Sequence, residues 1–221
     1  LLILDKPAGM AVHGGSGLSW GVIEALRAAR PEARFLELVH RLDRDTSGCL
    51  MLAKRRSALR AMHELLRRGQ VDKRYLALLR GPWTGGERWV EAPLEKFVLR
   101  GGERQVRVSE AGKPARTLFR PLDDHGRAVL VEVVLDTGRT HQIRVHAAHI
   151  GHPLAGDEKY GDPDFNRAMR ALGLRRLFLH AHSLAFAHPV TGEPVHVSAP
   201  LDDDLKTVLA RLEQTIDRRS D

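Results

Sequence analysis

Segments with strand-like and helix-like patterns follow one another in this chain without regular alternation, and this order constrains the fold more than any other feature. A doubly wound α/β fold needs strands and helices to alternate, whereas a chain that mixes them freely is typical of the α+β class. We therefore predict an α+β fold. The expected strands are 1–4, 49–53, 74–79, 105–108, 115–119, 128–135 and 177–187, and the expected helices are about 20–30, 57–68, 140–150, 165–172 and 202–218.

Capping residues place the starts of two of these helices. Ser19 is a candidate N-cap for the first, and Thr140 for the helix that carries Ile143 and Ala147 on its inward face. The stretch Gly81–Gly102 is rich in turn residues, so we expect a loop-rich, insertion-like region there rather than a domain boundary. Because the chain has no internal repeat and no interdomain linker, we expect one domain over residues 1–221.

The composition describes a globular and strongly basic chain. Hydrophobic residues make up 43% of 221 residues, and the formal net charge is +7 with an isoelectric point of about 10.1. A basic surface attracts polyanions and releases their counterions, so the charge favours nucleic acid over membrane lipid as a partner. The alternative is a solvated face whose cations are balanced by nearby acids.

Cysteine content and hydropathy bear on where the protein acts. Cys49 is the only cysteine, which excludes an intramolecular disulfide and fits a reducing compartment. No apolar run is long enough to cross a bilayer, and no signal peptide is visible. We expect a cytoplasmic protein without a membrane partner. Because the chain begins at Leu1 rather than at methionine, we also expect it to be a fragment.

The segment from Val39 to Gly48 carries the most chemical information. Its sequence, Val-His-Arg-Leu-Asp-Arg-Asp-Thr-Ser-Gly, places Asp43 close to Arg41 and Arg44 before a small polar turn. An opposite charge a few ångströms away favours the charged form of a carboxylate. The segment therefore predicts an ionised Asp43 that could act as a nucleophile or a base. Taken alone, such an aspartate more often caps a helix or forms a structural ion pair.

Several blocks of the chain, in the same order, resemble those of the RluA-type pseudouridine synthases. The family's catalytic motif is His-Arg-Leu-Asp-x-x-Thr-Ser-Gly, which matches residues 40–48. Other blocks resemble its first motif, its tyrosine motif, its arginine motif and two later glycine motifs. They are residues 5–15, 73–77, 137–146, 151–153 and 156–161. Together these blocks cover nearly the whole chain, so chance is a poor explanation for them.

The resemblance implies a fold and a reaction. The family fold is a mixed, mainly antiparallel sheet flanked by helices and loops, with the active-site cleft across the sheet. The reaction cuts the bond from ribose C1′ to uracil N1, turns the uracil and rejoins it through C5. It needs no cofactor. In the family the aspartate that Asp43 matches acts on the sugar or the base of the target nucleoside, and we leave open which atom it engages.

The resemblance also assigns roles to other residues. It places Tyr75 against the flipped uracil, where its hydroxyl could help to remove the C5 proton, and it pairs Arg144 with Asp43. A stacked base must be extruded before its glycosidic bond can be reached, and His40 and Arg41 are candidates to hold the displaced nucleotide or fill the gap. Three residues beside the expected helix start are predicted to bind substrate, namely Arg139, Thr140 and His141.

Similarity between residues 12–48 and one ribosomal member of the family implies large-subunit ribosomal RNA as the substrate, with transfer RNA as the alternative. Relatives of that kind carry a small N-terminal S4-type RNA-binding domain, which we expect to be absent from this chain. We further expect a monomer.

Two competing functions are a non-catalytic RNA-binding module and a hydrolase that uses Asp43 with Asp45 as a carboxylate pair. We favour a supporting hydrogen bond from Asp45 to Thr46 or Arg44 over the hydrolase. Four histidines crowd residues 141–152, but no cysteine cluster joins them, so we expect no metal site.

Overall fold

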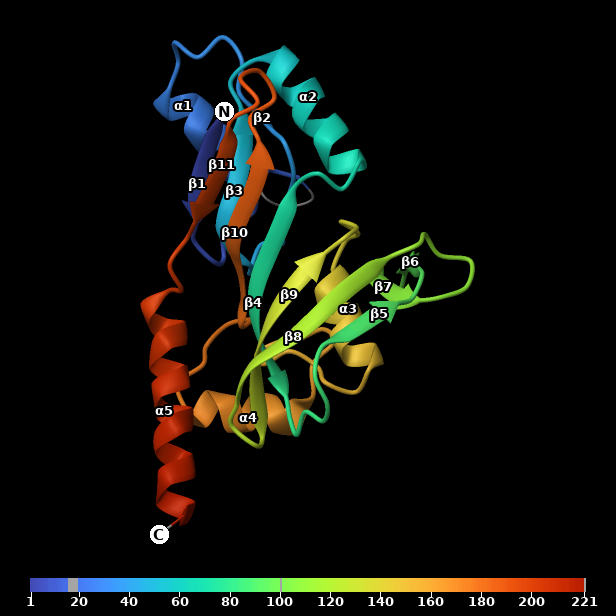
Figure 1. Ribbon diagram of the computed structural model, residues 1–221, viewed down its shortest axis with the longest axis vertical. Coiled ribbons are helices and arrows are strands. Elements are labelled where there is room, and N and C mark those ends of the chain that lie inside the picture. Colours follow the sequence, from blue (N-terminus) through green and yellow to red (C-terminus); the bar gives the residue numbers. More distant parts are fainter. Residues whose placement is uncertain (16–19, 100, 221) are drawn as a thin grey trace. The chain divides into compact units, whose positions relative to one another are not determined.

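The computed structural model describes residues 1–15, 20–99 and 101–220, and it divides into two compact units (Figure 1). Unit 1 comprises Leu1–Arg74 and His180–Pro200. Unit 2 comprises Tyr75–Leu179 and the chain from Leu201 onward. Each unit has its own hydrophobic core, and the two are described separately below.

A mixed sheet forms the centre of unit 1. Strands β1 (Leu2–Lys6) and β2 (Glu37–Leu38) lie antiparallel to β3 (Ser47–Ala53). Strand β10 (Leu179–Ala187) runs parallel to β3, and β11 (Pro194–Ser198) lies antiparallel to β10. Every residue of β3 is buried, as expected for a near-continuous apolar run. The turn that carries Asp43 leads directly into this strand.

Helices α1 (Val22–Ala29) and α2 (Arg56–Arg67) lie beside this sheet in Figure 1. Helix α2 is amphipathic: Met62 is fully buried, and Leu59 and Leu66 pack against the same core. The arginines of α2 lie on its exposed side, so the helix presents a basic surface to solvent.

Unit 2 is built mainly from antiparallel strands. Strand β4 (Asp72–Arg80) begins in unit 1, and β9 (Ala128–Leu135), β8 (Arg116–Asp124) and β5 (Arg88–Glu91) pair in that order. A separate hairpin consists of β6 (Leu94–Val98) and β7 (Arg104–Val108). The helices are α3 (Gln142–His149), α4 (Pro163–Ala171) and α5 (Asp203–Ser220). The core unites Phe178 with Met169 of α4 and with Leu205 and Leu212 of α5.

The α+β prediction and the mixed, mainly antiparallel sheet are confirmed, and strand 128–135 is found with the expected bounds. Two predictions were wrong. The stretch Gly81–Gly102 is not merely a loop, because it contains β5 and β6, which are stabilised by pairing with distant strands. The N-cap of α3 is His141 rather than Thr140. The proposed cap Ser19 lies outside the described residues, and α1 has Gly21 as its N-cap.

Among the described residues no helix is long and apolar enough to cross a membrane.

Candidate active site

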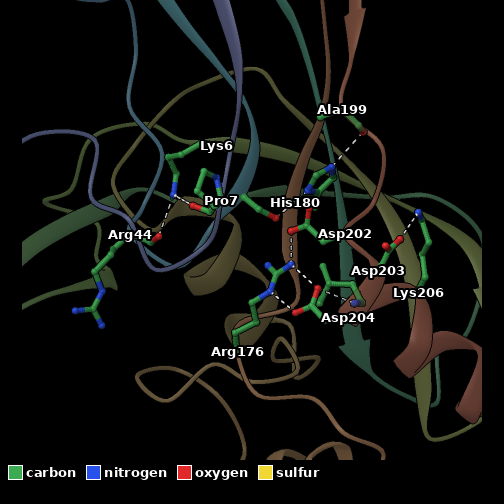
Figure 2. A network of polar contacts seen from close by, with 12 residues as sticks. Lys6, Pro7, Arg44, Arg176, His180, Ala199, Asp202, Asp203, Asp204 and Lys206 are labelled. Carbon is green, nitrogen blue, oxygen red and sulfur yellow. Dashed lines mark hydrogen bonds and ion pairs between the residues drawn. The ribbon is translucent and has the colours of Figure 1, made fainter. Parts of the chain in front are cut away.

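The turn around Asp43 is fixed by backbone hydrogen bonds and by a buried lysine. The Thr46 amide donates to the carbonyl of Asp43 (3.2 Å), and the Gly9 amide donates to the carbonyl of Arg44 (2.9 Å). The Lys6 ammonium, only 1% exposed, donates to the carbonyls of Arg44 (3.0 Å), Pro7 (2.8 Å) and Met10 (2.9 Å), and Figure 2 shows the first two bonds. Lys6 therefore ties the segment after β1 to the turn that carries Asp43.

Asp43 is half-buried, so part of its surface is open to solvent. Arg41 and Arg44 are exposed on either side of it. The Arg44 guanidinium donates to Asp45 at 3.2 Å. This contact confirms the expected bond between these side chains.

Ser47 follows the turn, begins β3 and takes part in a buried series of hydrogen bonds. The Nε2 of His180 is 3.2 Å from the carbonyl of Ala199, and Nδ1 is 2.8 Å from the Ser47 hydroxyl. If Nε2 carries the ring proton, Nδ1 accepts from the hydroxyl. Gly48 has φ +102°, and a Cβ there would lie 2.3 Å from the carbonyl oxygen of Ala181. The Thr-Ser-Gly turn is thus the point where β3 meets β10.

The predicted substrate-binding His40 has a well-defined structural contact. Its Nε2 accepts a hydrogen bond from the amide of Met51 (3.1 Å), which requires the imidazole to be neutral there. Desolvation and the nearby charge of Lys73 lower its pKa to about 4, in agreement with that bond. The nucleotide-holding roles of His40 and Arg41 stay predictions.

In unit 2, a buried chain of hydrogen bonds fixes the helix that carries Arg144. Gln142 donates to Thr117 Oγ1 (2.9 Å), whose hydroxyl lies 2.8 Å from Nδ1 of His146. The Nε2 of His146 is 2.9 Å from the carbonyl of Ala92. Desolvation lowers the pKa of His146, so the ring is neutral in this chain of bonds. One histidine of the crowded block, His146, therefore has a structural role in this buried chain of hydrogen bonds.

The predicted substrate-binding residues of this unit lie together at the start of α3. Arg139 is exposed and donates to the carbonyl of Pro114 (3.1 Å), and Thr140 is half-buried. His141 has φ 53°, a left-handed conformation that is uncommon for a residue other than glycine. Its Nδ1 lies 2.8 Å from the Tyr160 hydroxyl. Their contacts with substrate remain predictions.

Arg144 is the third residue of α3, and Asp157 binds its guanidinium through two hydrogen bonds of 2.7 and 2.8 Å. Tyr75 is buried on β4 with 7% of its surface exposed. The predicted pairing of Arg144 with Asp43 and the stacking of Tyr75 on uracil stay predictions. Among the residues that the structure describes, no group of three or more His, Cys, Asp or Glu side chains could hold a metal ion.

Sequence reasoning gave no role to Lys6, Ser47, His180 or Asp157. Lys6 and Ser47 lie inside blocks that were recognised, and Asp157 belongs to the Gly-Asp-x-x-Tyr-Gly block. The sequence feature that could have identified these residues is therefore a charged or polar side chain inside a recognised block. Its burial becomes visible only in the fold.

Comparisons with known proteins identify the relatives of this chain. Residues 1–149 match the family model described as RNA pseudouridylate synthase. Ribosomal large subunit pseudouridine synthase C of Pasteurella multocida is 59% identical over 214 residues, which are 97% of this chain and 66% of that protein. The protein of the same name from Haemophilus ducreyi is 58% identical over 212 residues, with shares of 96% and 66%. This chain thus spans slightly less than two thirds of the length of these relatives.

A solved structure, human RNA pseudouridylate synthase domain containing 4, superposes with a TM-score of 0.77 at 28% identity. It covers 96% of this chain and 89% of the human chain. The similarity thus extends through both compact units, including the blocks around Asp43, Tyr75 and Arg144. The chain belongs to the RNA pseudouridylate synthase family.

Proposed function

We propose that this chain isomerises uridine to pseudouridine in RNA, with Asp43 as the catalytic carboxylate. The observation that carries the proposal is the match of residues 1–149 to the synthase family, together with the half-buried Asp43 on a braced turn. The reaction exchanges one glycosidic bond for another within a single nucleotide. It therefore needs no oxidant, reductant or group donor.

In the proposed reaction, the Asp43 side chain acts on the sugar or the base of an extruded uridine. The N1–C1′ bond breaks, the uracil turns, and a C5–C1′ bond forms. The proton on C5 then leaves and N1 takes up a proton, so atoms and charge balance. Tyr75 stacks on the uracil and assists removal of the C5 proton, and Arg144 orients Asp43 with a planar, charged fork.

The nucleotide must leave its stack before any of these steps. Arg41, exposed two residues before Asp43, fills the vacated space, with His40 beside it. Residues 139–141, at the positive N-terminal end of α3, bind the RNA backbone.

We further propose large-subunit ribosomal RNA as the substrate. The names of the two bacterial relatives support this choice, since both are called ribosomal large subunit pseudouridine synthase C. Transfer RNA is the alternative substrate. We also propose that the chain acts as a monomer in the cytoplasm, which the single buried, free cysteine fits.

The surface of α2 supports RNA as the partner. Three exposed arginines in and beside its first turn form no ion pair among the described residues, and that turn holds no acid: Arg55, Arg56 and Arg60. Cations near a helix N-terminus interact unfavourably with the helix dipole, and a bound polyanion would compensate this cost. Arg67 and Arg68 on the last turn both pair with Glu64 and are the matched control.

Binding measured against salt concentration tests this surface. Replacing the three unpaired arginines by alanine should flatten the slope of log affinity against log salt by about 2, at roughly 0.7 per phosphate contact on single-stranded RNA. The Arg67→Ala, Arg68→Ala double variant should change the slope by less than about 1. Equal changes in both variants would argue against a specific role for the first turn.

The isomerase activity is tested with ribosomal RNA that carries tritium at uracil C5. We expect the chain to release tritium into water and Asp43→Asn to release none above background. A binding module would retain all tritium, and a hydrolase would liberate free uracil. Sequencing of modified positions after reaction with ribosomal and transfer RNA distinguishes the two substrates.

A further inference from the structure

Arg144 is held by a carboxylate of its own unit. Asp157 Oδ2 accepts from Nε of Arg144 (2.7 Å), and Oδ1 accepts from Nη2 (2.8 Å). The side chains are 1% and 12% exposed, respectively. Two parallel hydrogen bonds fix both the position and the plane of a guanidinium group. The direction of its other N–H groups is therefore fixed as well.

Asp157 is itself firmly anchored. Its Oδ1 also accepts from the amides of Lys159 (2.9 Å) and Tyr160 (3.0 Å). Its backbone carbonyl accepts from the amide of Gly161 (3.0 Å) and from Nδ2 of Asn166 (2.9 Å). Burial raises the pKa of the Asp157 carboxyl, but the hydrogen bonds and charge of Arg144 and the two amides outweigh it, and the pKa lies below its ordinary value. The carboxylate is thus charged at neutral pH.

Tyr160, which lies close to Asp157 in the sequence, also contacts the guanidinium of Arg144. The guanidinium carbon lies 5.1 Å from the centroid of the Tyr160 ring. The hydroxyl of Tyr160 accepts from the amide of Val106 (3.0 Å) and lies 2.8 Å from Nδ1 of His141. Residues 156–161 therefore contact the guanidinium twice: Asp157 at one edge and Tyr160 over one face.

We propose that Asp157 is a positioning residue for the uridine isomerisation, and that it sets the orientation in which Arg144 acts. This inference rests on the proposed function and on Arg144 being part of its machinery. Asp157 bonds the Nε and Nη2 side of the guanidinium, so the catalytic geometry of Arg144 depends on a residue outside the catalytic motif. A positioning error of an ångström at such a group is enough to slow a reaction strongly.

The substitution Asp157→Asn separates this role from the role of Asp157 in the turn. The amide oxygen of asparagine can still accept from Lys159 and Tyr160, but its NH2 group replaces Oδ2 and faces Nε of Arg144, donor against donor. Asp162→Asn is the matched control, because Asp162 pairs with Arg80 in the same part of the chain. Asparagine is also as good an N-cap as aspartate.

We expect Asp157→Asn to lower the single-turnover rate at saturating RNA by 10- to 100-fold and to change RNA affinity by less than 3-fold. The control should stay within 2-fold of the parent in both. A parental rate for Asp157→Asn would overturn the proposal. If that variant is insoluble, Asp157→Glu keeps the charge but displaces the fork, and we expect its rate to fall at least 5-fold; an unchanged rate would again overturn the proposal.

A double-variant cycle distinguishes positioning from general destabilisation. In an Arg144→Ala background, the residual rate should change by less than 3-fold on adding Asp157→Asn, because the group being positioned is gone. A further 10- to 100-fold loss there would show that Asp157 acts independently of Arg144, and the proposal would fail.

A second readout does not depend on activity. In ¹⁵N spectra of the whole chain, the Nε–H signal of Arg144 should be slow to exchange in the parent and in Asp162→Asn, and lost in Asp157→Asn. A persistent signal in Asp157→Asn would overturn the positioning role. A parent that is inactive on every RNA would refute the proposed function, and this signal would still decide whether Asp157 holds Arg144.

Discussion

The substitution Lys6→Met gives the sharpest test of how the turn that carries Asp43 is held in place. Methionine has nearly the length of lysine and fills the same space, but it cannot donate to the carbonyls of Pro7, Met10 and Arg44. The side chain is 1% exposed, so water cannot readily replace the ammonium. The carbonyl of Arg44 directly follows Asp43, so the effect should reach the active site.

The magnitude follows from these contacts. A hydrogen bond to a charged group contributes about 1.5–3 kcal/mol, and three of them do not add in full. Methionine also removes the cost of burying the ammonium, which offsets part of the loss. We therefore expect the free energy of unfolding to fall by about 2–4 kcal/mol. For a chain of this size, that corresponds to a melting temperature lower by roughly 5–15 °C.

Differential scanning calorimetry measures the effect, and tritium release reports on the catalytic turn. The matched control is Lys206→Met, because Lys206 is 54% exposed and pairs with the 97% exposed Asp203 (Figure 2). Such a pair contributes little, so the control should melt within about 2 °C of the parent. If Lys6→Met melts as the control does and keeps the parental rate, the reasoning about the buried ammonium is wrong.

Three further outcomes are expected. The pKa of His40 is lowered to about 4 in the folded chain, so the unfolded chain binds a proton on this residue first as the pH falls, and the free energy of unfolding should drop by roughly 3 kcal/mol between pH 6.5 and 4. Urea titrations at several pH values should show a flatter dependence of stability on pH for His40→Gln than for the parent. Parallel pH profiles of the two proteins would contradict this prediction. Gly48→Ala should prevent folding or lower the melting temperature by more than about 10 °C, since its Cβ would overlap the carbonyl of Ala181, and a parental melting curve would exclude that clash. Asp162→Ala removes the side chain that accepts from the Phe165 amide at the start of α4 and that pairs with Arg80. It should lower the urea midpoint, whereas an unchanged midpoint would mean that neither the cap nor the ion pair contributes to stability.

The sequence predicts the parts of the fold that local pattern determines. Helix α2 is one such case, because Leu59, Met62 and Leu66 recur at helical spacing, and β9 is another, because valines alternate along it. Strands β5 and β6 could not be predicted, since they are short, charged and separated by a proline. They form because β8 and β7 lie beside them.

The same distinction applies to the candidate site. The motif around Asp43 is readable because its residues are consecutive. The left-handed N-cap at His141 could not be predicted, because a residue other than glycine rarely adopts this conformation and the contact of His141 with Tyr160, 19 positions away, exists only in the folded chain. The buried charges of Lys6 and Asp157 are equally invisible in a linear pattern, where a charged residue is expected at the surface.

Unit 1 joins an early stretch of the chain to a late one, and this has a consequence for biosynthesis. The β3 strand that follows the Asp43 turn pairs with β10, so its sheet cannot close until residues near 180 have left the ribosome. About 100 residues separate the two parts, which at typical elongation rates is roughly 5–20 s of translation. An unfinished chain therefore cannot complete the sheet that follows the Asp43 turn. If the proposed function holds, we expect an incomplete chain that ends before β10 to show no isomerase activity.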